Sequence, residues 1–69
     1  MPEEVKSATE ATEVARSFLK KYRMITSPLR AVREGDAWLV EIDVGPIFKS
    51  VAKVKIDAKS GEILEYSLP

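Results

Sequence analysis

The sequence predicts an α+β domain, in which one N-terminal helix packs on one face of a four-stranded antiparallel meander sheet. Two observations support this prediction. Apolar residues recur at helical spacing up to Tyr22, and after Pro28 they alternate with polar residues, as in strands with one buried face. A chain of 69 residues has room for a single core, so we expect one domain over residues 1–69, with residues 1–6 flexible.

The helix is expected from about Ser7 to Arg23. Ser7 and Glu10 have the spacing of a capping box, in which the serine hydroxyl accepts a hydrogen bond from the amide of the glutamate. The helix stops before Ser27 and Pro28, because the residue before a proline is driven out of the α region. Its apolar face consists of Ala11, Val14, Ala15, Phe18, Leu19 and Tyr22.

Four strands are expected after the helix, separated by turn residues such as Gly35, Gly45 and Gly61. They cover Leu29–Val32, Trp38–Val44, Val51–Ile56 and the residues after Gly61. Because the connections are short, neighbouring strands should pair in antiparallel fashion.

The alternation also predicts how the strands pair. The pairs expected on the core face are Trp38 with Ile56, Val40 with Val54, Ile42 with Ala52 and Ile56 with Leu64, and Tyr66 and Leu68 continue that face. The opposite face then places Glu41 and Asp43 beside Lys53 and Lys55, which suits a solvated surface. A shift by one residue would bury the lysines, so the charge pattern independently supports this pairing.

Composition argues against an enzyme. The chain has no cysteine and no histidine, hence no thiolate and no imidazole ligand or base. No pattern indicates a catalytic, cofactor-binding or metal site, so none is predicted. Eleven basic residues balance eleven acidic ones, so no overall field attracts nucleic acid or an anionic membrane. The acidic N-terminus is unlike a secretory signal, which favours a cytoplasmic protein. The absence of Asn and Gln is typical of a thermophile.

The segment DAKSGE, from Asp57 to Glu62, is predicted to be a turn rather than a ligand loop. A calcium loop needs oxygen ligands at alternate positions, but Lys59 and Gly61 occupy those positions here. A phosphate loop needs a helix after its glycines, and no helix is expected there. Asp57 can instead cap a turn in which Gly61 takes the left-handed conformation.

Three further features have both a structural and a functional interpretation. Trp38 is expected in the core rather than as a platform for a ligand. Phe48 is expected to fold over the end of the core, although Ile47 and Phe48 could form a contact surface instead. Glu41 and Asp43 are expected to form a solvated ion-pair row with the lysines opposite, rather than an acid/base or metal site.

Three segments together resemble a PepSY-type domain. They are the helix start S-x-x-E-A-x-x-x-A at Ser7, the tryptophan-centred strand Trp38–Val40, and V-x-I-D-A-x-S-G-E-I-L from Val54 to Leu64. The resemblance spans most of the chain. It implies a small α+β binding or inhibitory module without catalysis of its own, of a kind often attached to peptidases or membrane proteins.

Two functional classes stay open. The first is a non-catalytic binding or regulatory module that contacts a protein partner or a second copy of itself, through an edge strand or through Leu39, Val51, Ile47 and Phe48. The second is a nucleic-acid-associated protein with a local basic patch of Arg16, Lys20, Arg23, Arg30 and Arg33. The balanced net charge makes nucleic acid the less favoured partner. No cofactor and no membrane contact are expected.

Overall fold

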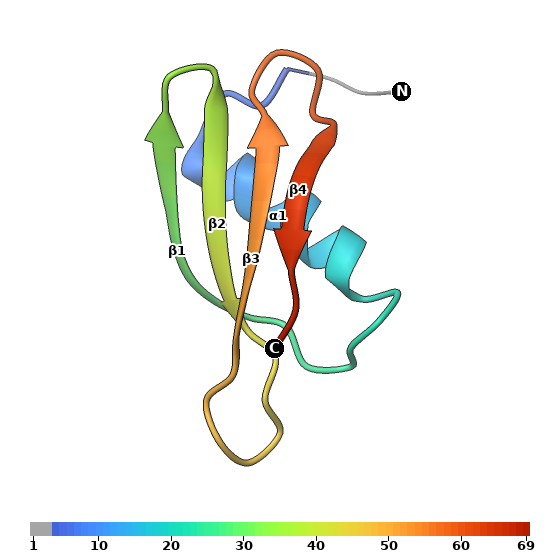
Figure 1. Ribbon diagram of the computed structural model, residues 1–69. Helices are drawn as coiled ribbons and strands as arrows, with labels where there is room; N and C mark the ends of the chain where they lie inside the picture. The colour runs from blue at the N-terminus through green and yellow to red at the C-terminus, as the bar shows by residue number, and fades with distance from the viewer. Residues whose placement is uncertain (1–3) are drawn as a thin grey trace.

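The computed structural model of the chain describes residues 4–69. In this range, one helix lies behind a four-stranded antiparallel sheet (Figure 1). The elements are α1 (Ala8–Leu19), β1 (Ser27–Glu34), β2 (Ala37–Asp43), β3 (Val51–Asp57) and β4 (Ile63–Ser67). The strands lie in the order β1-β2-β3-β4, so each one pairs with its neighbour in the sequence. The predicted α+β meander is confirmed.

The helix α1 begins as the sequence predicts but ends earlier. Ser7 is the N-cap, and its Oγ accepts a hydrogen bond from the amide of Glu10 at 3.2 Å. The Glu10 carboxylate in turn reaches back to a backbone amide before the helix. The helix ends at Leu19 rather than at Arg23, which corrects the prediction. The chain tightens there, because the N–H of Tyr22 bonds to the carbonyl of Leu19, only three residues back.

Pairing between β2 and β3 follows the prediction. Trp38 lies opposite Ile56, Val40 opposite Val54, and Ile42 opposite Ala52. The pairing of β4 differs, because the register shifts next to Ile56, so that Ile63 and not Leu64 lies opposite it. Leu64 is therefore exposed, whereas Tyr66 keeps its predicted position. A bulge adds one residue to one strand and breaks the simple alternation from which the pairing was inferred.

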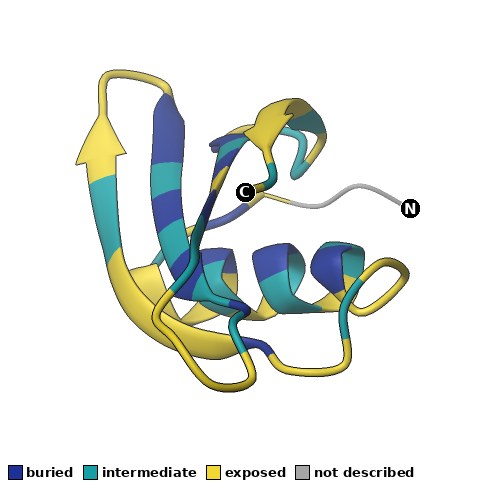
Figure 2. Ribbon diagram, turned by 60° about the horizontal axis from the view of Figure 1, so that its bottom comes forward, coloured by how far each residue is buried: buried dark blue, intermediate teal, exposed yellow. Residues whose placement is uncertain are grey.

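The core lies between α1 and the middle of the sheet (Figure 2). Trp38 belongs to it, as predicted. The buried residues are Val5, Ala11, Ala15, Leu19, Trp38, Val40, Ile42, Val44, Ala52, Val54, Ile56 and Ala58. Within the described chain, the backbone of α1 approaches β1, β2 and β3 but not β4. The helix therefore reaches the last strand only through side chains, such as Phe18, whose ring meets that of Tyr66.

Val5 fixes the segment before α1. Its N–H donates to the carbonyl of Ala58 at 2.7 Å, and its own carbonyl accepts a hydrogen bond from Nε1 of Trp38 at 3.0 Å. The Val5 side chain is buried in the core. Val5 is thus in contact with the core, residues 1–3 lie outside the described residues, and the flexibility of residues 1–6 stays a prediction.

Candidate functional site

The sheet has two edge strands of opposite character. An edge exposes unpaired backbone groups that can template another strand, and proteins protect such edges with proline, bulges and charged side chains. β1 has all three, since it contains Pro28, a register shift between Pro28 and Arg30, and the exposed Arg30 and Arg33. β4 has the sequence ILEYS, in which Glu65 is the one charged residue. β4 also has a bulge, next to Ile63, but it has no proline, and its pairing with β3 is regular from Glu65 to Ser67. This part of β4 is therefore open to a further strand.

Backbone hydrogen bonds show which groups of β4 are free. Along a strand, the N–H and C=O groups of successive residues point to alternate sides. The N–H of Asp57 donates to the carbonyl of Glu62 at 2.8 Å, so Asp57 and every second residue before it, including Lys55, face β4. Lys55 pairs with Glu65, whose backbone groups are thus used within the sheet. The N–H and C=O of Tyr66, the next residue, point to the free edge.

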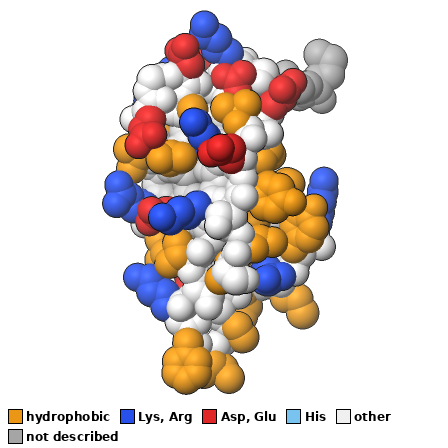
Figure 3. Space-filling view, viewed as in Figure 1, with side chains coloured by type: hydrophobic (Ala, Val, Ile, Leu, Met, Phe, Trp, Pro, Cys, Tyr) orange, Lys and Arg blue, Asp and Glu red, His pale blue; other side chains and the backbone are white. Residues whose placement is uncertain are grey.

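Three aromatic side chains, Phe18, Tyr22 and Tyr66, lie beside this edge and are called the aromatic cluster below. The rings of Phe18 and Tyr66 meet edge to face with their centroids 4.8 Å apart, and Tyr22 lies 5.6 Å from Phe18 and 6.2 Å from Tyr66. Tyr22 is 48% and Tyr66 is 51% exposed. Figure 3 shows hydrophobic side chains gathered on this flank of the sheet. Exposed tyrosines of this kind are typical of contact surfaces.

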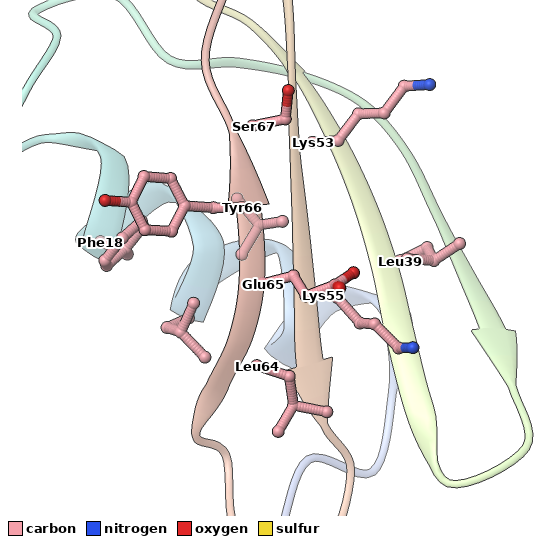
Figure 4. Close-up of a pocket in the computed structure, with 10 residues that line it drawn as sticks. Phe18, Leu39, Lys53, Lys55, Leu64, Glu65, Tyr66 and Ser67 are labelled. Atoms are coloured by element: carbon pink, nitrogen blue, oxygen red, sulfur yellow. The ribbon is translucent and has the colours of Figure 1, made fainter.

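A hollow of about 710 Å³ follows β4 and is bordered by residues from α1, β2, β3 and β4. Figure 4 shows Phe18 and Tyr66 on one side of β4, with Lys53, Lys55 and Leu39 on the other. An extended segment placed along the free edge of β4 would therefore lie beside Phe18 and Tyr66, whereas the lysines belong to the neighbouring strand β3.

The charged side chains of the outer face do not form the predicted row of ion pairs. The register places Glu41 opposite Lys53, as predicted. Over residues 4–69, however, no lysine lies within 4.0 Å of a carboxylate, so the predicted row is wrong as a set of direct ion pairs. Asp43 contributes instead to the loop that follows β2. Lys53 can therefore meet a further carboxylate beyond β4.

The loop between β2 and β3, at the bottom of Figure 1, is built around Asp43. Oδ1 of Asp43 accepts hydrogen bonds from the amides of Ser50 and Gly45, both at 3.0 Å, and these bonds lower the pKa of Asp43. Gly45 is tightly enclosed, since a Cβ there would lie 1.8 Å from the carbonyl oxygen of Phe48. Ile47 and Phe48 are held away from the core, 84% and 81% exposed. The prediction that Phe48 folds over the core is wrong.

The contact residues expected from the sequence lie in two places. Leu39 is half-buried on the outer face and borders the hollow beside β4. Val51 lies at the start of β3, close in sequence to the exposed Ile47 and Phe48. Sequence analysis missed the aromatic cluster as a surface, because its members were assigned to the buried faces of the helix and the sheet. Their positions in the sequence could have indicated the surface, since these aromatic residues lie towards the ends of the apolar faces of the helix and the last strand.

The DAKSGE segment is a turn, as predicted. Oγ of Ser60 donates to Oδ2 of Asp57 at 2.7 Å, and the amide of Lys59 donates to Oδ1 at 3.4 Å. These bonds, with that from Ser60 first, lower the pKa of Asp57. Gly61 has a φ of 77°, in the left-handed region, and its N–H donates to the carbonyl of Asp57 at 2.8 Å. The turn positions β4 against β3.

The arginines of the proposed basic patch are partly engaged within the chain. The guanidinium of Arg16 donates to Glu13 at 3.2 Å and to Thr26 at 3.5 Å. That of Arg33 donates to the carbonyl of Gly35 at 2.6 Å and lies 5.5 Å from the ring centroid of Trp38. The other members are Lys20, Arg23 and Arg30, which follow α1 or belong to β1. The structure adds no support to the nucleic-acid hypothesis.

The fold and the site define a class, a small α+β domain with one protected edge and one open edge lined by aromatic residues. Among residues 4–69, no helix is long and apolar enough to cross a membrane. The same residues include no group of three or more His, Cys, Asp or Glu arranged to hold a metal ion. The chain matches no family model, no curated protein and no solved structure. The resemblance to PepSY-type domains stays a prediction.

Proposed function

We propose that this chain is a non-catalytic protein-binding module that pairs the free edge of β4 with an extended segment of a protein. The observation that supports the proposal is the contrast between the two edges of the sheet. β1 carries the features that prevent strand addition, whereas β4 lacks a proline and a bound helix and has the aromatic cluster beside it.

In strand addition, the backbone and the side chains make different contributions to binding. Hydrogen bonds from the main chain supply affinity, and the pockets beside alternate side chains supply specificity. The free N–H and C=O of Tyr66 would provide the first kind of contact. Leu39, Phe18 and Tyr66 border the hollow and would provide the second.

The exposed loop at Ile47 and Phe48, with Val51 beside it, is a second apolar contact surface in the same proposal. A loop held by Asp43 and Gly45 loses little conformational freedom when it binds, which favours a preformed contact. A peptidase as the partner, or a regulatory role, follows from the PepSY resemblance alone.

The test uses peptides selected from a random library for binding to the protein. Their affinity is measured for the parent and for Tyr66→Pro, which removes the free N–H of β4 without removing a hydrogen bond to β3. We expect Tyr66→Pro to weaken binding by at least about tenfold, since it removes a main-chain bond and an aromatic contact. Shifts of backbone amide resonances on binding should concentrate in β4.

Arg33→Pro is the matched control, because by the same alternation the N–H of Arg33 points to the free edge of β1. It should leave peptide affinity within about twofold, and Tyr66→Ala separates loss of the ring from loss of the N–H. Peptides that bind Tyr66→Pro as well as they bind the parent would place recognition elsewhere. A library that yields no binder would contradict the proposal.

A further inference from the structure

We infer that the segment that pairs with β4 is the β4 strand of a second copy of this chain, in a two-fold symmetric antiparallel dimer centred on Tyr66. The inference rests on the proposed function, since it names the partner of the same edge. It follows from the backbone pattern, the charges and the apolar residues of β4, which are self-complementary in one register.

The backbone restricts the possible registers. In an antiparallel pair related by a two-fold axis perpendicular to the sheet, one residue faces its own equivalent at the centre. A hydrogen-bonded centre requires a residue whose N–H and C=O both point outward. Tyr66 meets this requirement, because the groups of Glu65 and Ser67 on either side are directed to β3. The N–H of Tyr66 in each copy would donate to the Tyr66 carbonyl of the other.

In this register, acidic side chains on the outer face of one copy lie near basic side chains of the other. Glu65 of one copy would lie opposite Ser67 of the other, and Ser67 itself pairs with Lys53. Strands in a sheet are about 4.8 Å apart, so the long side chains of Glu65 and Lys53 can meet across the small serine. Glu65 also lies beside Lys55 in its own sheet. The row across the interface would therefore read Lys55, Glu65, Ser67 and Lys53, and its symmetric equivalent would repeat it.

A competing centre at Glu65 is disfavoured. It would place two carboxylates directly opposite each other, and like charges in directly opposed positions destabilise a strand pair. It would also leave Lys53 opposite no acidic residue of the second copy.

The other face of β4 supplies the apolar part of the contact. Tyr66 of each copy would meet its equivalent, and the two aromatic clusters would join across the axis. Strand addition at this position also covers the hollow that follows β4.

The geometry predicts a closed dimer rather than a fibre. Two copies joined at β4 form one continuous eight-stranded sheet with both helices on the same face, and the outermost strands are then the two copies of β1. These carry Pro28, the bulge and two arginines, so a third copy finds no open edge.

The mass of the protein is measured by sedimentation velocity from about 1 μM to about 1 mM, a range that brackets weak self-association. We expect a concentration-dependent dimer in the parent and a monomer in Tyr66→Pro over the whole range. Glu65→Lys, which places a third lysine in the charged row, should weaken the dimer by about tenfold or more. Glu34→Lys on β1 is the control for added charge and should leave the dimer unchanged.

A cross-link tests the register directly, since the chain has no cysteine of its own. Directly opposed residues of a hydrogen-bonded pair have Cα atoms about 5.5 Å apart, which suits a disulfide. Tyr66→Cys should therefore form a covalent dimer under mild oxidation, and Arg33→Cys on β1 should stay monomeric. Equal cross-linking of the two variants would overturn the inference.

The remaining outcomes separate this inference from the proposed function. A parent chain that stays monomeric at the highest concentration overturns the dimer, while a library peptide that depends on Tyr66 would still support strand addition at β4. A dimer that persists in Tyr66→Pro places self-association on another surface and also overturns the inference. Absence of both the dimer and a Tyr66-dependent peptide would contradict both proposals.

Discussion

The two edges of one sheet are built in opposite ways. β1 lies close to α1 and carries a proline and exposed arginines, whereas the backbone of α1 does not approach β4, and half-exposed tyrosines lie beside this strand. The difference shows how a chain of 69 residues can use separate elements for stability and for binding. The helix and the first three strands provide the buried core, and the last strand remains available for recognition.

The largest difference in stability is expected between substitutions of two aromatic residues, one buried in β2 and one half-exposed in β4. Trp38→Ala should lower the free energy of unfolding by about 3–5 kcal/mol, because the ring is buried and its Nε1–H is bonded to Val5. Tyr66→Ala should cost about 1 kcal/mol in dilute solution, where only its aromatic contacts are lost. Urea unfolding at low protein concentration measures both. Equal losses would show that β4 belongs to the core as much as β2 does.

A smaller effect is expected at the turn that attaches β4. Gly61→Val should cost about 1–2 kcal/mol, because Gly61 has a φ of 77° and a β-branched residue resists the left-handed conformation. Lys59→Val, in the same turn but at negative φ, is the control and should cost clearly less. Hydrogen exchange should show the amides of β4 losing protection before those of β2. If the amides of all four strands lost protection together, β4 would not be a less stable part of the sheet than β2.

Acid should weaken the loops that border β3. The pKa values of Asp43 and Asp57 are lowered below 3.8 in the folded chain by hydrogen bonds to their carboxylates. Each group therefore stabilises the fold above its unfolded pKa, and this contribution disappears as the pH falls through the lowered value. The free energy of unfolding should therefore fall as the pH is lowered through 3.8 and below. Replacing both residues by Asn keeps an acceptor oxygen and should flatten this dependence.

The smallest effect on stability is expected at Phe48. Its side chain is 81% exposed, so Phe48→Ser should change the free energy of unfolding by less than about 0.5 kcal/mol. Gly45→Ala in the same loop is the contrast, because its Cβ would collide with the carbonyl of Phe48 and force the loop open. A thermal melt compares the two. A large loss in Phe48→Ser would mean that this ring supports the core after all.

The regular alternation of apolar and polar residues along the strands made much of the fold predictable. The pairing of β2 with β3, the burial of Trp38 and the turn at Gly61 follow from a period of two residues and from the conformational needs of glycine. The bulge in β4 did not follow, because an inserted residue changes the register without changing the composition of the strand. Leu64 was consequently assigned to the wrong face.

The candidate site was harder to predict because it depends on what the helix leaves uncovered. Tyr22 and Tyr66 are correctly placed on apolar faces by their spacing, but spacing does not show that α1 stops at Leu19 and approaches only the first three strands. The exposure of Phe48 depends on the loop path, which is set by bonds from Asp43 to backbone amides that no side-chain pattern encodes.

The bonds of Val5 have a consequence for the order of folding. Val5 and Ala58 are joined although most of the chain separates them, whereas the strand pairs are formed between neighbours along the sequence. Closing so long a loop carries a larger entropy cost than forming a hairpin, and it can happen only after the turn at Ala58 exists. The hairpins should form first and Val5 should dock last. Substitutions at Val5 should therefore accelerate unfolding while leaving the rate of folding almost unchanged.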